Sequence, residues 1–278
     1  MNSMVKRNVK LYFRDKTNMF FSMLSVLIII GLFVLFLGQG NWGSNEIRDS
    51  WLMAGVLAVA SVTTALGAIS QMVEDKVYKK NKGFYASPIK RGHITVGYIL
   101  SPLFVSVIMT SLTAIGFGAY IILTGGNIPG IGGILQLAGL ILLSGITSTA
   151  LVCFMVSFLK TNSSYGTVST IIGTLAGFLM GIYIPVGNLP GAVQTVIMFF
   201  PPAHAAMLFR RILMEQPLEI VHNLPPGTFD LASLQETLGV VFRFGDFEIT
   251  PLMSIGFLIV SAILFFGLSV INMRKAGR

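Results

Sequence analysis

A stretch of 66 residues, from Ile94 to Leu159, contains no Asp, Glu, Lys or Arg. The only strong break inside it is the segment from Thr124 to Gly130, which holds three glycines and a proline. A single helix over the whole stretch would be roughly 100 Å long, whereas the hydrocarbon core of a bilayer is about 30 Å thick. The stretch therefore predicts two membrane crossings joined by a short turn.

The rest of the chain has the composition of a membrane protein. With 54% hydrophobic and 11% charged residues, a soluble chain of 278 residues could not cover its surface with polar groups. Uncharged runs predict six crossings, at residues 19–37, 51–73, 94–123, 131–159, 164–184 and 249–273. We therefore expect an all-α polytopic membrane protein that forms one domain over residues 1–278.

Basic residues gather on one side of this predicted topology. The N-terminal segment, the loop after the second crossing, Lys160 and the C-terminal tail hold 15 of the 19 lysines and arginines, and the opposite loops hold eight of the 11 acids. Because cytoplasmic loops carry the excess of Lys and Arg, both termini are expected in the cytoplasm. The net charge of +8 then reflects membrane insertion and is a poor indicator of nucleic-acid binding.

Two cytoplasmic segments carry additional patterns. In residues 1–18, apolar side chains recur at helical spacing opposite lysines and arginines, which predicts an amphipathic helix at the membrane interface; the alternative is a positive flank that only orients the first crossing. Residues 74–93 mix charges with aromatic side chains, which is typical of a docking surface for a soluble partner. The alternative there is a solvated, positively charged loop.

The predicted crossings contain small and hydroxyl residues but no ionisable ones. Three glycines spaced four residues apart in the fifth crossing predict close helix packing: Gly173, Gly177 and Gly181. Proton- or sodium-coupled carriers usually place a carboxylate near the bilayer midplane, so secondary transport is disfavoured. The absence of charge favours an apolar or amphipathic substrate.

The last external segment, residues 185–248, is far longer than any other loop. Its apolar stretches, 191–200 and 202–213, are too short to cross a bilayer. We expect a re-entrant helical pair that gates the outer exit; the alternative is a surface helix that only caps the fold. No role is assigned to residues 217–248.

In their order along the chain, these motifs resemble the permease subunits of ABC-2 type exporters, also called type V exporters. Members of this family have an Arg-Asp pair before the first crossing, as Arg14 and Asp15 are here. After the second crossing they carry acidic and basic residues and a proline element, to which residues 74–91 are similar. An aromatic-proline junction followed by a helix with arginine is similar to residues 199–211. The resemblance covers essentially the whole chain.

The resemblance implies that cytosolic ABC ATPases dock on the connecting helix (residues 1–18) and the coupling loop (residues 74–93), through Arg14, Asp15, Glu74, Lys79, Lys80, Phe84, Pro88 and Arg91. It also implies a second permease, either a copy of this chain or a related paralogue. Crossings two and five would then border the substrate route at the dimer interface, lined by Thr63, Thr64, Gln71, Thr167, Thr170 and Thr174. The corresponding external gate would be Phe199, Phe200, Pro201 and Pro202.

The chain has no Gly-Lys dipeptide, so it has no Walker A loop to bind nucleotide phosphates. ATP and Mg²⁺ are therefore expected on the partner ATPase, and this chain is expected to be neither an enzyme nor a metal protein. The leading hypothesis is the permease of an exporter in the plasma membrane, moving an apolar or amphipathic substrate out of the cytoplasm or inner leaflet. The rival hypothesis is a six-span anchor or passive channel without an ATPase. Drugs, antimicrobial peptides, lipid-linked glycans and ions all remain open as substrates.

Overall fold

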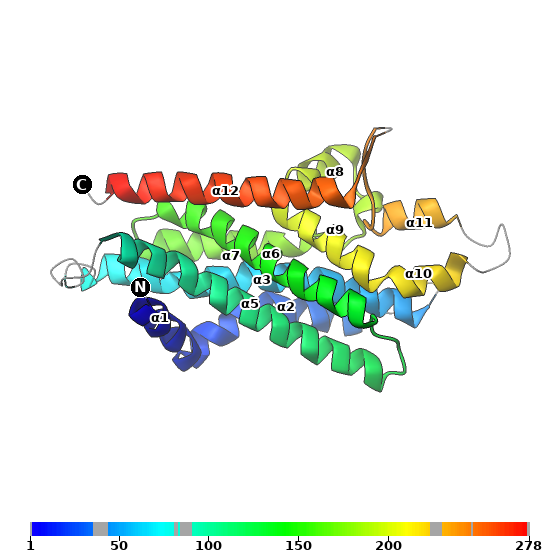
Figure 1. Ribbon diagram of the computed structural model, residues 1–278, viewed down its shortest axis with the longest axis horizontal. Coiled ribbons are helices and arrows are strands. Elements are labelled where there is room, and N and C mark those ends of the chain that lie inside the picture. The colour runs from blue at the N-terminus through cyan, green and yellow to red at the C-terminus, as the bar shows by residue number, and fades with distance from the viewer. Residues whose placement is uncertain are drawn as a thin grey trace.

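The computed structural model describes residues 2–35, 44–80, 83, 91–222, 230–245 and 247–276. Most of its helices run lengthwise in an elongated bundle, and α1 begins at the same end of the bundle as that at which α12 ends (Figure 1). An even number of crossings, such as the six predicted, would place the first and last helix ends on the same side of the membrane. We call this end the inner end and the opposite end the outer end.

The elements follow one another in a simple order. The helices of the bundle and its bent segments are α1 (Asn2–Arg14), α2 (Lys16–Leu35), α3 (Asn45–Val77), α5 (Arg91–Leu123), α6 (Ile131–Ser157), α7 (Asn162–Leu179), α8 (Gly191–Met198), α9 (Pro201–Leu213) and α12 (Pro251–Ala276). The outer end adds short elements, namely η2 (Val186–Asn188), α10 (Glu215–His222), α11 (Leu231–Thr237), β1 (Phe242–Phe244) and β2 (Phe247–Ile249).

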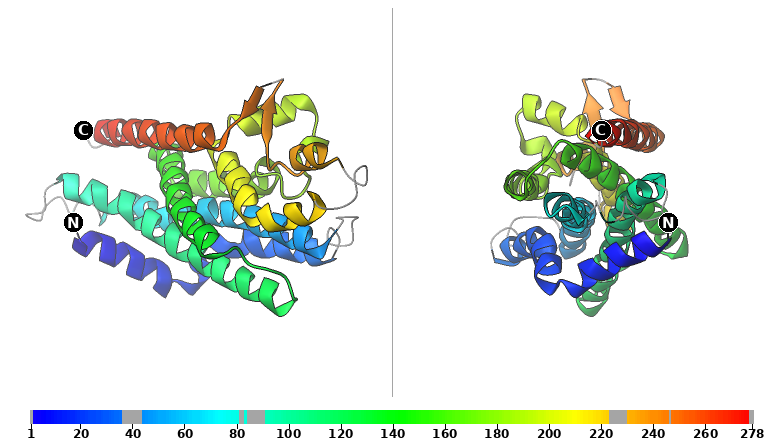
Figure 2. Two further views of the ribbon diagram at one scale, coloured as in Figure 1. Left: turned by 45° about the vertical axis from the view of Figure 1, so that its right-hand side comes forward. Right: turned by 90° about the vertical axis from the view of Figure 1, so that its left-hand side faces the viewer.

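Helix α3 is the central helix of the bundle. Its most apolar 18 residues are all buried, and it packs against α2, α5, α6, α7 and α9. Small side chains make this possible: a Cβ added at Gly67 would overlap Ser22 of α2, and one added at Gly55 would overlap Ile182. Figure 2 shows the other helices arranged around it. The sequence of α3 thus determines how closely its neighbours can approach.

The outer helices expose apolar side chains instead of polar ones. On α5, Phe104, Ile108, Leu112 and Ile115 form an exposed stripe at helical spacing. On α12, Leu252, Val260 and Ile263 are each more than 60% exposed. Continuous exposed apolar faces of this length are what a helix presents to lipid. The helical fold, with long apolar helices exposed at its surface, is that of a polytopic membrane protein.

Among the described residues, four helices are long and apolar enough to cross a membrane: α3, α5, α6 and α12. Two bent pairs could each supply one more crossing. The first joins α1 to α2 at an angle of 76°, and the second joins α8 to α9 at 93°. The bend of the first pair separates the amphipathic segment from the predicted first crossing. The bend of the second lies at the aromatic-proline junction.

Helix α7 corresponds to the predicted fifth crossing but is not among those four helices. It has 18 residues, and its first half contains several serines and threonines, which lower its hydropathy. It nevertheless packs along α3 in the bundle. Helices are therefore present at the predicted crossings, but the number of six crossings stays a prediction.

Hydroxyl groups hydrogen-bond across the buried interior. The Oγ of Ser61 on α3 lies 2.9 Å from the Oγ of Ser148 and 2.9 Å from that of Ser144, both on α6. Ser106 of α5 donates to the backbone oxygen of Ser61 at 2.8 Å. Because hydrocarbon offers no partner for these hydroxyls, bonding between helices both satisfies them and connects α3, α5 and α6.

The outer end carries the described part of residues 185–248. The strands β1 and β2 form a two-stranded antiparallel hairpin in which Arg243 pairs with Glu248. This hairpin is a departure from the all-α expectation. Phe242 is buried, and its ring meets that of His204 on α9 edge to face, with centroids 5.5 Å apart. The hairpin is thus anchored on α9.

The three glycines of the fifth crossing occupy different environments. A Cβ at Gly173 would lie 3.1 Å from Ser25 Oγ of α2, whereas one at Gly177 would overlap the ring of Tyr183. Gly181 lies beyond the end of α7 with φ of +63°, and the N–H of Ile182 bonds back to the oxygen of Gly177. This is the left-handed turn with which many helices end, and it favours glycine.

We expect Gly181→Ala to destabilise the protein. The left-handed backbone costs a residue with a Cβ about 1–2 kcal/mol, and the added methyl would also overlap Val186. The midpoint of thermal unfolding in mild detergent should fall by several degrees. Gly118→Ala on α5 is the control, because nothing lies within 4 Å of its Cβ position. Equal midpoints for the two variants would contradict the turn described here.

Candidate functional site

The inner end of α3 carries a carboxylate that is fully buried. Asp75 has 0% exposure, and Arg7 of α1 forms a salt bridge with it. The Nη1 of Arg7 donates to Oδ2 at 2.8 Å and the Nη2 donates to Oδ1 at 3.2 Å. Such a two-pronged contact fixes direction as well as distance. Arg7 therefore holds the amphipathic helix in one orientation against α3.

Two further donors complete the environment of Asp75. The hydroxyl of Tyr98 on α5 donates to Oδ2 at 2.7 Å, and Nε2 of Gln71 donates to Oδ1 at 3.1 Å. A buried carboxylate needs this many donors to offset the loss of water. The hydrogen bond between Arg7 and Asp75 raises the pKa of Arg7 above its ordinary value, so the guanidinium stays charged at neutral pH. We call Arg7, Gln71, Asp75 and Tyr98 the inner network; it joins α1, α3 and α5.

The bend between α1 and α2 is fixed by a second group of contacts. The hydroxyl of Tyr12 lies 2.5 Å from Ser22 Oγ, and Nδ2 of Asn18 donates to the oxygen of Gly67 at 3.1 Å. Asp15 lies between the two helices, and its Oδ1 accepts from the N–H of Asn18 at 2.9 Å, as a helix N-cap does. Asp15 of the Arg-Asp pair therefore begins α2. Arg14 is exposed beside it.

Of the predicted docking loop, residues 74–93, the structure describes residues 74–80, 83 and 91–93. Glu74 is half-buried at the end of α3, and Lys79 follows with a φ of +55°. The ammonium of Lys80 lies 5.5 Å from the ring centre of Tyr78, and both residues are exposed. Phe84 and Pro88 lie outside the described residues, as does the side chain of Arg91, where α5 begins. Exposed charge thus lies next to the inner network.

The predicted lining residues lie on two helices, α3 and α7, in different environments. Thr63 and Thr64 are buried inside α3's packing, where their hydroxyls donate to the oxygens of Val59 and Ala60. Gln71 belongs to the inner network. The three threonines of α7 are exposed: Thr167, Thr170 and Thr174. The hydroxyl of each donates to the backbone oxygen four residues before it. The structure does not bring the two groups together on one surface of the chain.

The predicted external gate lies at the bend between α8 and α9. Pro201 and Pro202 are buried in the first turn of α9, where proline suits the helix start. Phe199 is 70% exposed and Phe200 is partly buried. Near this bend, His204 is held by Ser254 of α12 at 3.0 Å and by the oxygen of Met198 at 2.7 Å.

A buried cation on α9 connects the helical pair α8 and α9 to the end of α7. Arg210 is fully buried, and its Nη2 donates to the oxygens of Met180 at 2.6 Å and Gly181 at 3.0 Å. These carbonyls directly follow the last residue of α7, at the helix end where the dipole favours positive charge. The guanidinium also lies 5.3 Å from the ring centre of Trp51 on α3. Within the described residues, Arg210 Nε and Nη1 have no hydrogen-bond partner.

Sequence patterns did not reveal the partners of Asp75 or the burial of Arg210. Arg7 and Asp75 are 68 positions apart, and each lies among other charges of its own segment. The available signal was a pair of acids, Glu74 and Asp75, at the inner end of α3, in a chain with only 11 acids. For metals, the described part of the chain has no group of three His, Cys, Asp or Glu side chains placed to hold an ion.

A comparison with family models confirms the resemblance. Residues 43–271 match the model described as "ABC-2 family transporter protein". The match begins after α1 and α2, so the Arg-Asp element lies outside it. A search of curated proteins found no match. Because the matched region covers most of the 278 residues, the chain belongs to the ABC-2 family of transporter proteins.

Proposed function

We propose that this chain is the permease subunit of an ATP-driven exporter, with both termini in the cytoplasm and a separate ABC ATPase docking at the inner end. The observation that carries the proposal is the inner network. Arg7, Asp75 and Tyr98 connect the amphipathic helix, the central helix and α5 next to the exposed lysines of the loop. A force applied to this end would reach α1, α3 and α5 together.

Export requires two conformations whose balance the ATPase shifts. The network supports such a shift because its members are held by directional bonds, so α1 and the inner end of α3 are displaced as a unit. The exposed hydroxyl face of α7 supports a second permease packing there, either a copy or a paralogue. The substrate is apolar or amphipathic, since the four long helices offer no ionisable side chain between their ends to pair with a charged solute.

The docking proposal is tested by purifying the tagged chain from its native membranes in mild detergent and identifying its partners by mass spectrometry. We expect a stoichiometric ABC ATPase with the wild-type chain and its loss after Lys79→Glu, Lys80→Glu and Lys82→Glu together, because the reversed charges would repel the docking surface. Lys160→Glu, on another inner loop, is the control. An ATPase that stays bound to the triple variant would remove this loop from the docking surface. Reproducible absence of any ATPase from the intact wild-type chain would favour the anchor or channel.

The coupling role of the network is tested with Arg7→Gln. This change leaves the buried carboxylate of Asp75 with two fewer donor groups, while the contact of Met4 with Gly97 still holds α1 on α5. We expect the ATPase to co-purify normally, but the stimulation of its ATP hydrolysis by the permease to fall about tenfold, as loss of 1–2 kcal/mol of coupling gives. Lys10→Gln removes an exposed charge from the same helix and should change neither. Normal stimulation in Arg7→Gln would overturn the role.

The bend at Phe200 and Pro201 supports a gate at the outer end. Replacing Pro201 and Pro202 with alanine removes the fixed start of α9 and should uncouple hydrolysis from export in the reconstituted complex. Hydrolysis is then retained while export of the substrate falls. Pro217→Ala, on α10, is the matched control. Unchanged export in the double variant would show that the bend has no gating role.

A further inference from the structure

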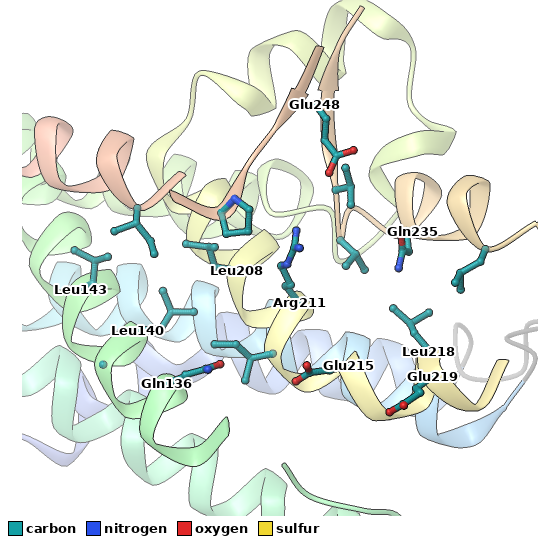
Figure 3. A pocket seen from close by; sticks show the side chains of 17 residues that line it. Gln136, Leu140, Leu143, Leu208, Arg211, Glu215, Leu218, Glu219, Gln235 and Glu248 are labelled. Atoms are coloured by element: carbon teal, nitrogen blue, oxygen red, sulfur yellow. The ribbon is translucent and has the colours of Figure 1, made fainter. Parts of the chain in front are cut away.

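An open cavity of about 930 Å³ lies at the outer end, lined by residues of α6, α9, α10, α11, β2 and the start of α12 (Figure 3). Cavities of several hundred Å³ are the usual size of small-molecule sites. It lies far along the bundle from the inner network. None of the residues predicted to line the substrate route borders it.

One side of the cavity is apolar. Leu140 and Leu143 project from α6, Leu208 and Ile212 from α9, and Ile255 from α12. These three helices belong to the bundle itself. Their side chains give the cavity a wall that would cover the apolar body of a ligand, at the typical gain of roughly 25 cal/mol per Å² removed from water.

The charged side chains of the cavity lining are mainly acidic. Glu215 and Glu219 stand four positions apart on α10, and Glu248 reaches in from β2, with Arg211 as the only basic residue in the lining. Figure 3 shows Leu140 and Leu143 on one side of the cavity and Glu219 and Glu248 on others. Glu248 lies 3.6 Å from Arg243, but both are nearly half exposed, so this pair is weak. Three carboxylates facing one guanidinium leave the cavity with a negative charge.

We propose that this cavity binds an organic cation with an apolar body. The apolar wall receives the body, and the carboxylates of Glu215 and Glu219 attract the charge at a rim that water still reaches. Anionic amphiphiles, including acidic lipids, would be repelled by the same groups. Binding here needs no ATPase, so it can be measured whether or not the exporter proposal holds.

The test uses the full chain in nanodiscs of phosphatidylcholine, with empty nanodiscs subtracted. The probes are tetraphenylphosphonium and tetraphenylborate, which have nearly the same shape and opposite charges. We expect saturable binding of the phosphonium, weakened by added salt, and no saturable binding of the borate. Absence of saturable phosphonium binding, or equal binding of the borate, would overturn the proposal.

Variants locate the site. Glu215→Gln with Glu219→Gln should weaken phosphonium binding about tenfold, because it keeps the side-chain size and removes both charges. The matched control is Glu46→Gln with Glu236→Gln, which removes the same charge at the outer end outside the cavity lining. Val241→Trp should weaken binding by narrowing the cavity. If the cavity variants bind as the control does, the cation occupies another place and the proposal fails.

Discussion

Hydrocarbon supplies no hydrogen-bond partner, and the arrangement of this bundle depends on that constraint. Several polar groups that the helices carry inward have their partner on another part of the chain. Ser61 bonds to Ser144 and Ser148, Asp75 bonds to Arg7 and Tyr98, and Arg210 bonds to the carbonyls that directly follow α7. Each of these contacts joins segments far apart in the sequence. Packing of small residues on α3 brings the helices close, and the polar contacts determine how they are oriented.

The helical architecture could be predicted because its causes are local. Charge-free runs, the turn at residues 124–130 and the basic segments reflect bilayer thickness and membrane insertion, which act on each stretch separately. The amphipathic helix before α2 was predicted for the same reason, since its apolar spacing lies within 13 residues. Order along the chain was enough to identify the family, even though each motif alone is short.

The features that could not be predicted from the sequence depend on contacts between distant parts of the chain. Nothing in the pattern around Asp75 indicates that α1 would return to it, and Gly181 has the same spacing as Gly173 although it ends the helix instead of packing within it. The hairpin of β1 and β2 spans only three residues on each strand, too few for alternation to be recognised. The side chains that line the cavity at the outer end come from five helices and a strand, so no single segment of the sequence predicts the cavity.

Arg210 has a mechanical consequence. Its guanidinium is carried by α9 and buried, yet it bonds to the two carbonyls that directly follow α7. Sliding α7 away from α9 would leave a desolvated cation without its acceptors, which costs far more than moving both helices together. Moving α7 and α9 together keeps these bonds, so the two helices act as one lever. Any opening at the outer end would tilt this lever as a whole.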